Sequence, residues 1–153
     1  MITTYLDDIA VGDTATSRRR TITETDIVGF AQFTGDWHPI HTVTPYAEAD
    51  PRFGERIAHG ALVLSVALGL VEFWPPAMRA FYGVDRLRFV APTRIGDTLH
   101  VETEVLDVAA RGDGDGVVTY RFVVRDQDGR DKCVADLKAL VAARPETEPA
   151  EPW

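Results

Sequence analysis

The stretch from Gly60 to Val71 is the feature that most constrains how this chain can fold. It reads GALVLSVALGLV, without a charge and with apolar residues on nearly every face of a helix. A helix that is apolar all round must be surrounded by protein, and in a chain of 153 residues we expect the surrounding body to be a sheet. We expect the helix to begin near Gly60 and to stop at Trp74-Pro75-Pro76, because proline cannot continue it.

The C-terminal half has the pattern of that sheet. Apolar and polar residues alternate in several segments, as in strands with one wet face, and short glycine-containing turns separate them, as in an antiparallel meander. The fold class is therefore α+β, with an antiparallel sheet around a central helix. The expected strands are Thr14–Ser17, Val84–Val90, Thr98–Val108, Val117–Arg125 and Lys132–Ala142.

A second helix is expected before the apolar one. Thr23 is suited to cap it, and Asp26 stands at the third helical position, a capping box with Asp in place of Glu. The helix should run over residues 24–34 and end at Gly35. A short helix should follow at Thr44–Ala49, with Thr44 as its cap.

Asp36 and His41 are five residues apart, in what we expect to be irregular backbone, with Pro39 stiffening the turn between them. A carboxylate beside an imidazole is the minimal equipment for activating a water molecule. In the alternative interpretation Asp36 caps a helix and the histidines only pack, and spacing alone does not decide between the two. A metal site would use Asp36, His38, His41 and His59, but Pro39 disfavours a shared helix for His38 and His41, and no metal is expected.

His59 and Gly60 stand where the apolar helix begins. Its first N–H groups have no partners within the helix and carry the positive end of the helix dipole. Gly60 has no side chain, so a substrate carbonyl could approach its N–H closely. Such a donor suits an oxyanion hole. The alternative is that Gly60 only allows close packing of the helix on the sheet.

Four motifs together resemble the MaoC-like dehydratases, the (R)-specific enoyl-CoA hydratase group. The resemblance covers about residues 5–142, and it implies a hot-dog fold and a homodimer, or a higher homo-oligomer, with a tunnel for the acyl thioester near the subunit interface. No nucleotide-binding motif is present, and no cofactor is expected. The motifs are Gly35–Thr42 (GDWHPIHT), Ile57–Leu62 (IAHGAL), Arg88–Pro92 (RFVAP) and Ile95–Thr98 (IGDT).

The resemblance implies that Asp36 and His41 are catalytic. They would hold the water that adds to C3 of a trans-2-enoyl thioester and manage the proton delivered to C2, while the Gly60 N–H would bind the thioester oxygen. The chain departs from the family pattern at two positions. His38 stands where the family often has Asn, and Val43 where it usually has Asp, and neither change removes a reacting group.

Several other residues are assigned supporting roles. His38 and His59 are expected to be scaffold, and Ser65, on the first turns of the helix, to touch the active-site turn. Candidate CoA-binding cations are Arg86, Arg88 and Arg94, each of which could equally belong to a solvated strand face. Large side chains that could plug or line the tunnel are Trp37, Phe73, Trp74, Phe81 and Tyr82. His100 is expected at the surface, and Cys133 as a small buried residue.

The leading function is therefore a hydratase/dehydratase that interconverts trans-2-enoyl-CoA and (R)-3-hydroxyacyl-CoA, as in fatty acid metabolism, with an acyl-carrier-protein thioester as the other possible substrate form. Two alternatives remain. One is a hot-dog thioesterase, in which the carboxylate activates water against the thioester carbonyl. The other is a non-catalytic subunit that binds acyl thioesters, for which the pairing of Asp36 with His41 would be unnecessary.

Composition excludes several classes of protein. The net charge of −8 argues against nucleic-acid binding, and the dense cations at Arg18–Arg20 are expected to be a solvated segment rather than an anion site. The apolar run is shorter than the roughly 20 residues that span a bilayer, and no signal-peptide pattern begins the chain, so we expect a cytoplasmic protein without membrane contact. We expect a single domain over residues 1–143, followed by a disordered, acidic, proline-rich tail over 144–153.

Overall fold

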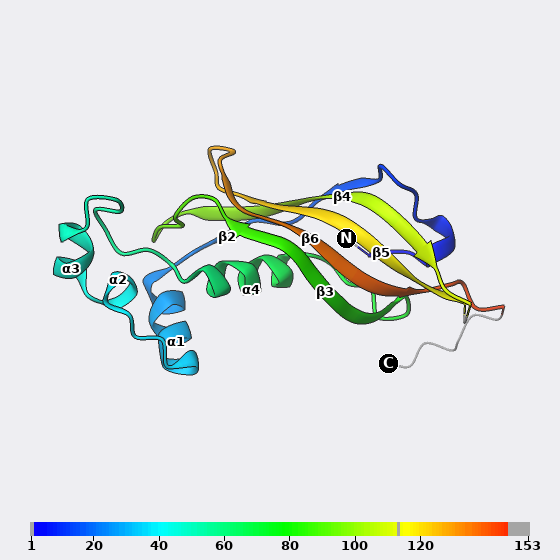
Figure 1. Cartoon of the computed structure of the whole chain (residues 1–153), viewed down its shortest axis with the longest axis horizontal. Coiled ribbons are helices and arrows are strands. Elements are labelled where there is room, and N and C mark those ends of the chain that lie inside the picture. Colours follow the sequence, from blue (N-terminus) through cyan, green and yellow to red (C-terminus); the bar gives the residue numbers. More distant parts are fainter. Residues whose placement is uncertain (1, 113, 147–153) are drawn as a thin grey trace.

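The apolar helix is the centre of the fold. In the computed structural model, which describes residues 2–112 and 114–146, α4 (Gly60–Leu70) lies along one face of a curved antiparallel sheet (Figure 1). The predicted α+β class, with an antiparallel sheet and a central helix, is confirmed. Among these described residues no helix is both long enough and apolar enough to span a membrane.

The sheet has the order β1-β4-β5-β6-β3, with β2 also paired to β4. β4, β5 and β6 form the predicted meander, but β3 lies beside β6 at the far edge instead of next to β4. Residues 90–97 carry the chain from β3 across the end of the sheet to β4, a distance of about 14 Å for three strand spacings. The strands are β1 (Thr14–Thr16), β2 (Arg20–Thr21), β3 (Met78–Phe89), β4 (Thr98–Ala110), β5 (Asp115–Arg125) and β6 (Asp131–Ala142).

One side of α4 forms the core with the sheet, and the other side does not. A stripe of small residues, Ala61, Ser65 and Gly69, is exposed in this single chain. The expectation that protein covers the helix on every side is therefore wrong for one chain alone. The buried α4 side chains, which pack in the same cluster as Leu99, Val101 and Phe122 of the sheet, are Leu62, Val63, Val66, Ala67 and Leu70.

α4 also ends earlier than predicted, at Leu70 instead of Trp74. The backbone that follows pairs with the N-terminal segment: Ile2 N–H donates to the Glu72 carbonyl at 3.0 Å, and Trp74 N–H donates to the Ile2 carbonyl at 2.8 Å. This pairing with a distant segment competes with the helix, so the chain leaves it before the prolines are reached.

The helices before α4 follow the predicted order with two changes. α1 (Glu24–Thr34) has the predicted Thr23–Asp26 capping box and ends at Gly35 with φ 79°. α3 (Thr44–Ala49) forms as expected, but its cap is Val43, and Thr44 is the first helical residue. A one-turn helix that was not predicted, α2 (Pro39–Thr42), precedes it, and η1 (Leu6–Asp8) lies near the N-terminus.

Three further expectations have clear outcomes. Cys133 is buried as expected, and burial raises the pKa of its thiol to about 11. His100 is buried, not at the surface, because β2 and β5 flank β4 at this point, and its Nε2 lies 3.5 Å from a Glu102 oxygen. Of the expected tail, Arg144 donates its backbone N–H to Asp7 at 2.6 Å, and residues 147–153 lie outside the described residues.

Candidate active site

A cavity of about 380 Å³ lies where α4 begins, and residues of three of the four sequence motifs line it. His41 and Gly60 both line it, so the structure brings together groups that are far apart in the sequence. The rest of the wall is mostly apolar, with Phe53, Phe89 and Lys132 among its side chains. Such a mixture of apolar wall and few polar groups is typical of small-molecule sites.

Short-range hydrogen bonds position Asp36 and His41. The Asp36 carboxylate accepts the His38 N–H at 3.2 Å, and the His38 Nδ1 accepts the Ile40 N–H at 3.2 Å, which caps α2. Because Pro39 is well suited to the first turn of a helix, His41 lies on α2 and not in irregular backbone as predicted. Asp36 does lie outside the helices, and its side chain is 53% exposed.

The hydrogen bond of His41 defines its tautomer. Its Nδ1 lies 2.8 Å from the Ile57 carbonyl oxygen, which can only accept, so Nδ1 carries the proton. Burial lowers the pKa of His41 below the ordinary value of 6.5, although the bond to Ile57 and the Asp36 charge oppose this shift. His41 is therefore neutral at neutral pH, and its Nε2 is a free base.

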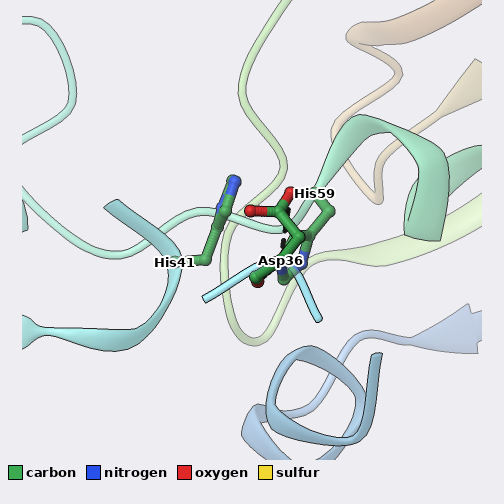
Figure 2. A group of neighbouring side chains, drawn as sticks. All are labelled: Asp36, His41 and His59. Carbon is green, nitrogen blue, oxygen red and sulfur yellow. Dashed lines mark hydrogen bonds and ion pairs between the residues drawn. The ribbon is translucent and has the colours of Figure 1, made fainter. Parts of the chain in front are cut away.

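His59 contacts both Asp36 and His41. It is 3% exposed, and its Nε2 donates to the Asp36 backbone carbonyl at 3.0 Å. Its ring stacks on that of His41, with centroids 3.8 Å apart and an interplanar angle of 28°. Figure 2 shows Asp36 and His41, which come from one short stretch of chain, next to His59, which immediately precedes α4.

These three residues can hold a water molecule more readily than a metal ion. One polar atom from each lies within 4.8 Å of the others, and a water that makes hydrogen bonds of about 2.8 Å can bridge such a gap. A zinc ion would need ring nitrogens aimed at one point about 2.0 Å away. Two nearly parallel, stacked rings do not direct their nitrogens in this way, and one nitrogen of each ring already donates to a carbonyl.

Gly60 is the first residue of α4, so its N–H has no acceptor within the helix. The structure requires a residue without a side chain here, because a Cβ at this position would lie 2.6 Å from the ring of Phe89 at the end of β3. Gly60 therefore allows close packing and also places a free backbone donor at the cavity. The two interpretations of this glycine are compatible.

The remaining predicted site residues lie elsewhere. The Ser65 hydroxyl donates to the Ala61 carbonyl at 2.8 Å, and Ser65 lines a separate groove of about 590 Å³ with Arg18, Arg19 and Arg20. Within that groove Arg18 donates to the Gly69 carbonyl at 3.1 Å.

The three candidate CoA-binding arginines have partners within the chain. Arg86 pairs with Asp136, Arg88 donates to the Leu87 carbonyl at 2.7 Å, and Arg94 pairs with Glu55 at 2.6 Å. Arg94 is next to the cavity-lining Thr93, whereas Arg86 and Arg88 lie on β3.

Most residues of the cavity wall belong to the four sequence motifs, but only His41 and Gly60 were predicted to act in the site. None of the five aromatic residues predicted for the tunnel lines this cavity, and Phe53 and Phe89 do so instead. The motif RFVAP, which contains Phe89 and precedes Thr93, contributed to the family resemblance, but it was not predicted to line the cavity. Lys132 could not be identified from its neighbourhood, because two of its three partners, Pro92 and Asp97, are distant in the sequence.

Known proteins match this chain over most of its length. The family model described as MaoC like domain matches residues 9–126. Protein MaoC of Klebsiella aerogenes is 42% identical over 63% of this chain and 29% of its own length. The 3-hydroxybutyryl-CoA dehydratase of Methylorubrum extorquens is 38% identical over 68% and 65%, respectively. The (R)-specific enoyl-CoA hydratase of Rhodospirillum rubrum is 38% identical over 65% and 67%. The matched part is thus under a third of the Klebsiella protein and about two thirds of the other two.

Solved structures agree with this match. A monoamine oxidase regulatory protein of Archaeoglobus fulgius superposes with a TM-score of 0.86 at 37% identity, covering 93% of this chain and 96% of that one. A Mycobacterium tuberculosis protein with a double hotdog fold superposes with a TM-score of 0.82 at 22% identity, covering 96% of this chain and 46% of that one. Because its sequence identity is low, the second match supports the fold alone, and it confirms the hot-dog architecture.

Proposed function

The chain belongs to the MaoC-like dehydratase family, and from this membership and the site geometry we propose that it hydrates trans-2-enoyl thioesters reversibly to (R)-3-hydroxyacyl thioesters. Two relatives at 38% identity are a 3-hydroxybutyryl-CoA dehydratase and an (R)-specific enoyl-CoA hydratase. The observation that carries the proposal is the juxtaposition of Asp36, His41 and the free Gly60 N–H beside one mainly apolar cavity.

The proposed reaction uses the Asp36 carboxylate and the neutral His41 imidazole to bind and activate one water molecule. The Asp36 carboxylate and the His41 Nε2 hold one water, and the pair takes a proton from it as its oxygen bonds to C3. The electron pair of the C2–C3 double bond moves toward the thioester carbonyl, which becomes enolate-like. The proton held by the pair is then delivered to C2, so the elements of water add across the double bond and the residues return to their starting states.

The Gly60 N–H stabilises the negative charge that develops on the thioester oxygen. A backbone donor at a helix N-terminus is already oriented, so it needs no rearrangement as the charge forms. The helix dipole acts in the same direction. The ring of Phe89 limits the space beside this donor and so shapes the part of the cavity that the acyl group would enter.

The decisive experiment follows two signals in one reaction. With crotonyl-CoA, hydration removes the enoyl absorbance and releases no thiol, whereas a thioesterase releases free CoA that a thiol reagent detects. We expect loss of absorbance without thiol, and a product with the (R) configuration. Thiol release would instead identify a thioesterase. Saturable binding with no turnover, tested across short and long enoyl thioesters on CoA and on acyl carrier protein, would identify a binding subunit.

Replacing Gly60 with alanine should damage the site while sparing the fold. The added methyl group would meet the Phe89 ring at 2.6 Å, and because Phe89 is 48% exposed its ring can rotate away. We expect the melting temperature to change little and kcat/KM to fall about tenfold to a hundredfold, the scale of a misplaced reacting group. Steady-state kinetics on the purified variant measure this.

The control for this change is Gly69→Ala on the same helix, where an added Cβ meets nothing within 4 Å. That variant should keep full activity. The double variant Gly60→Ala/Phe89→Ala should recover part of the lost kcat/KM, because the obstructing ring is gone. An unimpaired Gly60→Ala enzyme would show that the space between Gly60 and Phe89 is irrelevant to the reaction.

We also propose that the working form is a homodimer or a higher homo-oligomer. β3 is an edge strand of the sheet, paired only with β6 among the described residues, and Phe81, Tyr82 and Phe89 on it are 48%, 56% and 48% exposed. An unpaired edge strand with exposed aromatic side chains is suited to pairing with another chain. A second copy would bring apolar surface to the mouth of the cavity, and Arg94 and Arg88 are the nearest candidates to meet the phosphates of CoA.

A further inference from the structure

Lys132 on β6 is a buried cation that the proposed mechanism does not use. It is 4% exposed, and its ammonium group lies 3.0 Å from the Pro92 carbonyl oxygen, 2.9 Å from an Asp97 oxygen and 3.1 Å from an Asp126 oxygen. The contacts with Pro92 and Asp97 are hydrogen bonds, and the contact with Asp126 is an ion pair. These three partners hold the ammonium group in one place, and the Lys132 side chain lines the same cavity as His41 and Gly60.

The three partners come from three segments that meet at one end of the sheet. Pro92 belongs to the loop after β3, Asp97 immediately precedes β4, and Asp126 begins the β5–β6 turn. Figure 1 shows this turn at the same end of the sheet as the start of α4. Through these contacts Lys132 links the 90–97 loop to the hairpin of β5 and β6.

The fastened loop in turn holds the catalytic segment. The carbonyl of Thr93, next to Pro92, accepts the Ala58 N–H at 2.8 Å, and Arg94 forms a β-bridge with Ile57. The carbonyl of Ile57 is the acceptor that orients His41, at 2.8 Å from its Nδ1. A continuous path of short contacts therefore runs from the Lys132 ammonium to the imidazole, and Gly60 is two residues beyond Ala58.

Backbone N–H groups and the Lys132 ammonium stabilise the two carboxylates of this cluster. Burial alone would raise the pKa of Asp126, but the backbone N–H groups of Arg130 and Asp128 and the Lys132 charge hold it below its usual value. Asp97 also accepts the Arg94 N–H at 2.9 Å. Buried ion pairs are often no more stabilising than apolar side chains of the same size. A role in fixing geometry accounts for such a cluster better than a role in stability.

We propose that Lys132, held by Asp97 and Asp126, is a positioning residue that sets the orientation of His41 and the place of the Gly60 N–H through the Pro92–Thr93 loop. This inference rests on the proposed hydration reaction, because it assigns its effect to that chemistry. Loss of the ammonium should leave the substrate-binding wall present but the reacting groups less well aligned. The predicted signature is a fall in kcat with little change in KM.

The test uses the full-length protein and three variants. Lys132→Met removes the ammonium but leaves two buried carboxylates without their counter-charge. The triple variant Lys132→Met/Asp97→Asn/Asp126→Asn removes all three charges and keeps side chains of similar size. The control is Lys138→Met on the same strand, where the ion pair with Asp85 at 2.6 Å is partly exposed and away from the cavity. Crotonyl-CoA kinetics, circular dichroism and amide hydrogen exchange at Ala58 are measured on each.

The expected result is a folded triple variant whose kcat is about tenfold to a hundredfold lower, whose KM stays within about threefold, and whose Ala58 amide exchanges faster. Lys138→Met should match the wild type in all three. A triple variant with wild-type kcat or unchanged Ala58 exchange would overturn the inference. Failure of the triple variant to fold would overturn it too, because the cluster would then be a stability element. A wild-type protein without hydratase activity would refute the proposed function, while Ala58 exchange would still decide whether Lys132 holds the segment.

Discussion

Asp36→Asn should reduce kcat for enoyl-CoA hydration by about a thousandfold, within the range that a positioned acid–base group contributes. The amide has nearly the shape of the carboxylate, so it can still accept the His38 N–H that the Asp36 Oδ1 accepts at 3.2 Å. What it loses is the negative charge that, in the proposed reaction, helps to hold the attacking water and to take its proton. Because half of this side chain is exposed, the loss should be chemical and not structural.

The matched control for this change is Asp107→Asn, an exposed aspartate on β4 outside the cavity. It should have wild-type kcat. Circular dichroism and melting temperature should agree for the wild type and both variants. If Asp36→Asn hydrated crotonyl-CoA at the wild-type rate, the carboxylate would have no part in the reaction, and the proposed roles of the pair would have to be abandoned.

His41→Asn should have an effect of similar size, again about a hundredfold to ten-thousandfold on kcat. The asparagine amide can take the place of the imidazole Nδ1 and donate to the Ile57 carbonyl, which His41 contacts at 2.8 Å. The change therefore preserves the contact that orients the residue and deletes the basic Nε2. Steady-state kinetics measure the loss, and His100→Asn is the control, since His100 is a buried histidine that lies on β4 outside the cavity.

The pH dependence of the wild type gives an independent check on His41. Burial lowers the pKa of this imidazole below 6.5, so the neutral base persists into mildly acidic solution. We expect kcat/KM to fall as the pH drops through that lowered pKa, with a midpoint below 6.5. The depressed pKa also makes the folded state lose stability on the acid side, below 6.5, so circular dichroism at each pH must show that the protein remains folded. A midpoint above 6.5 would contradict the lowered pKa of the partly buried His41 imidazole.

The fold could be predicted from the sequence wherever the determining contacts are local. The cap at Thr23, the end of α1 at Gly35 and the apolar period of α4 all act within a few residues, and each was correct. The end of α4 was wrong because the residues after it pair with Ile2, far away in the sequence. The strand order was wrong for β3 because pairing with β6 depends on how the 90–97 loop crosses the sheet, which no local pattern specifies.

The same division applies to the candidate site. Asp36 and His41 could be recognised because one short turn holds both, and their meeting with Gly60 was expected only through the family motifs. The burial that lowers the pKa of His41, the stacking of His59 and the contact of Phe89 with Gly60 appear only in the structure.

By itself, the sequence determined the central helix and the α+β class, because these depend on side-chain periodicity, and it made Asp36 and His41 a candidate pair, because one short turn holds both. Only the tertiary structure decided which face of α4 is left uncovered, which side chains wall the cavity and that Lys132 lies at one end of a path to His41. The physical reason is that these features arise from contacts between segments distant in the sequence, such as Lys132 with the Pro92 carbonyl 40 residues away. Such contacts form through the register of the strands and the closure of the sheet over the helix.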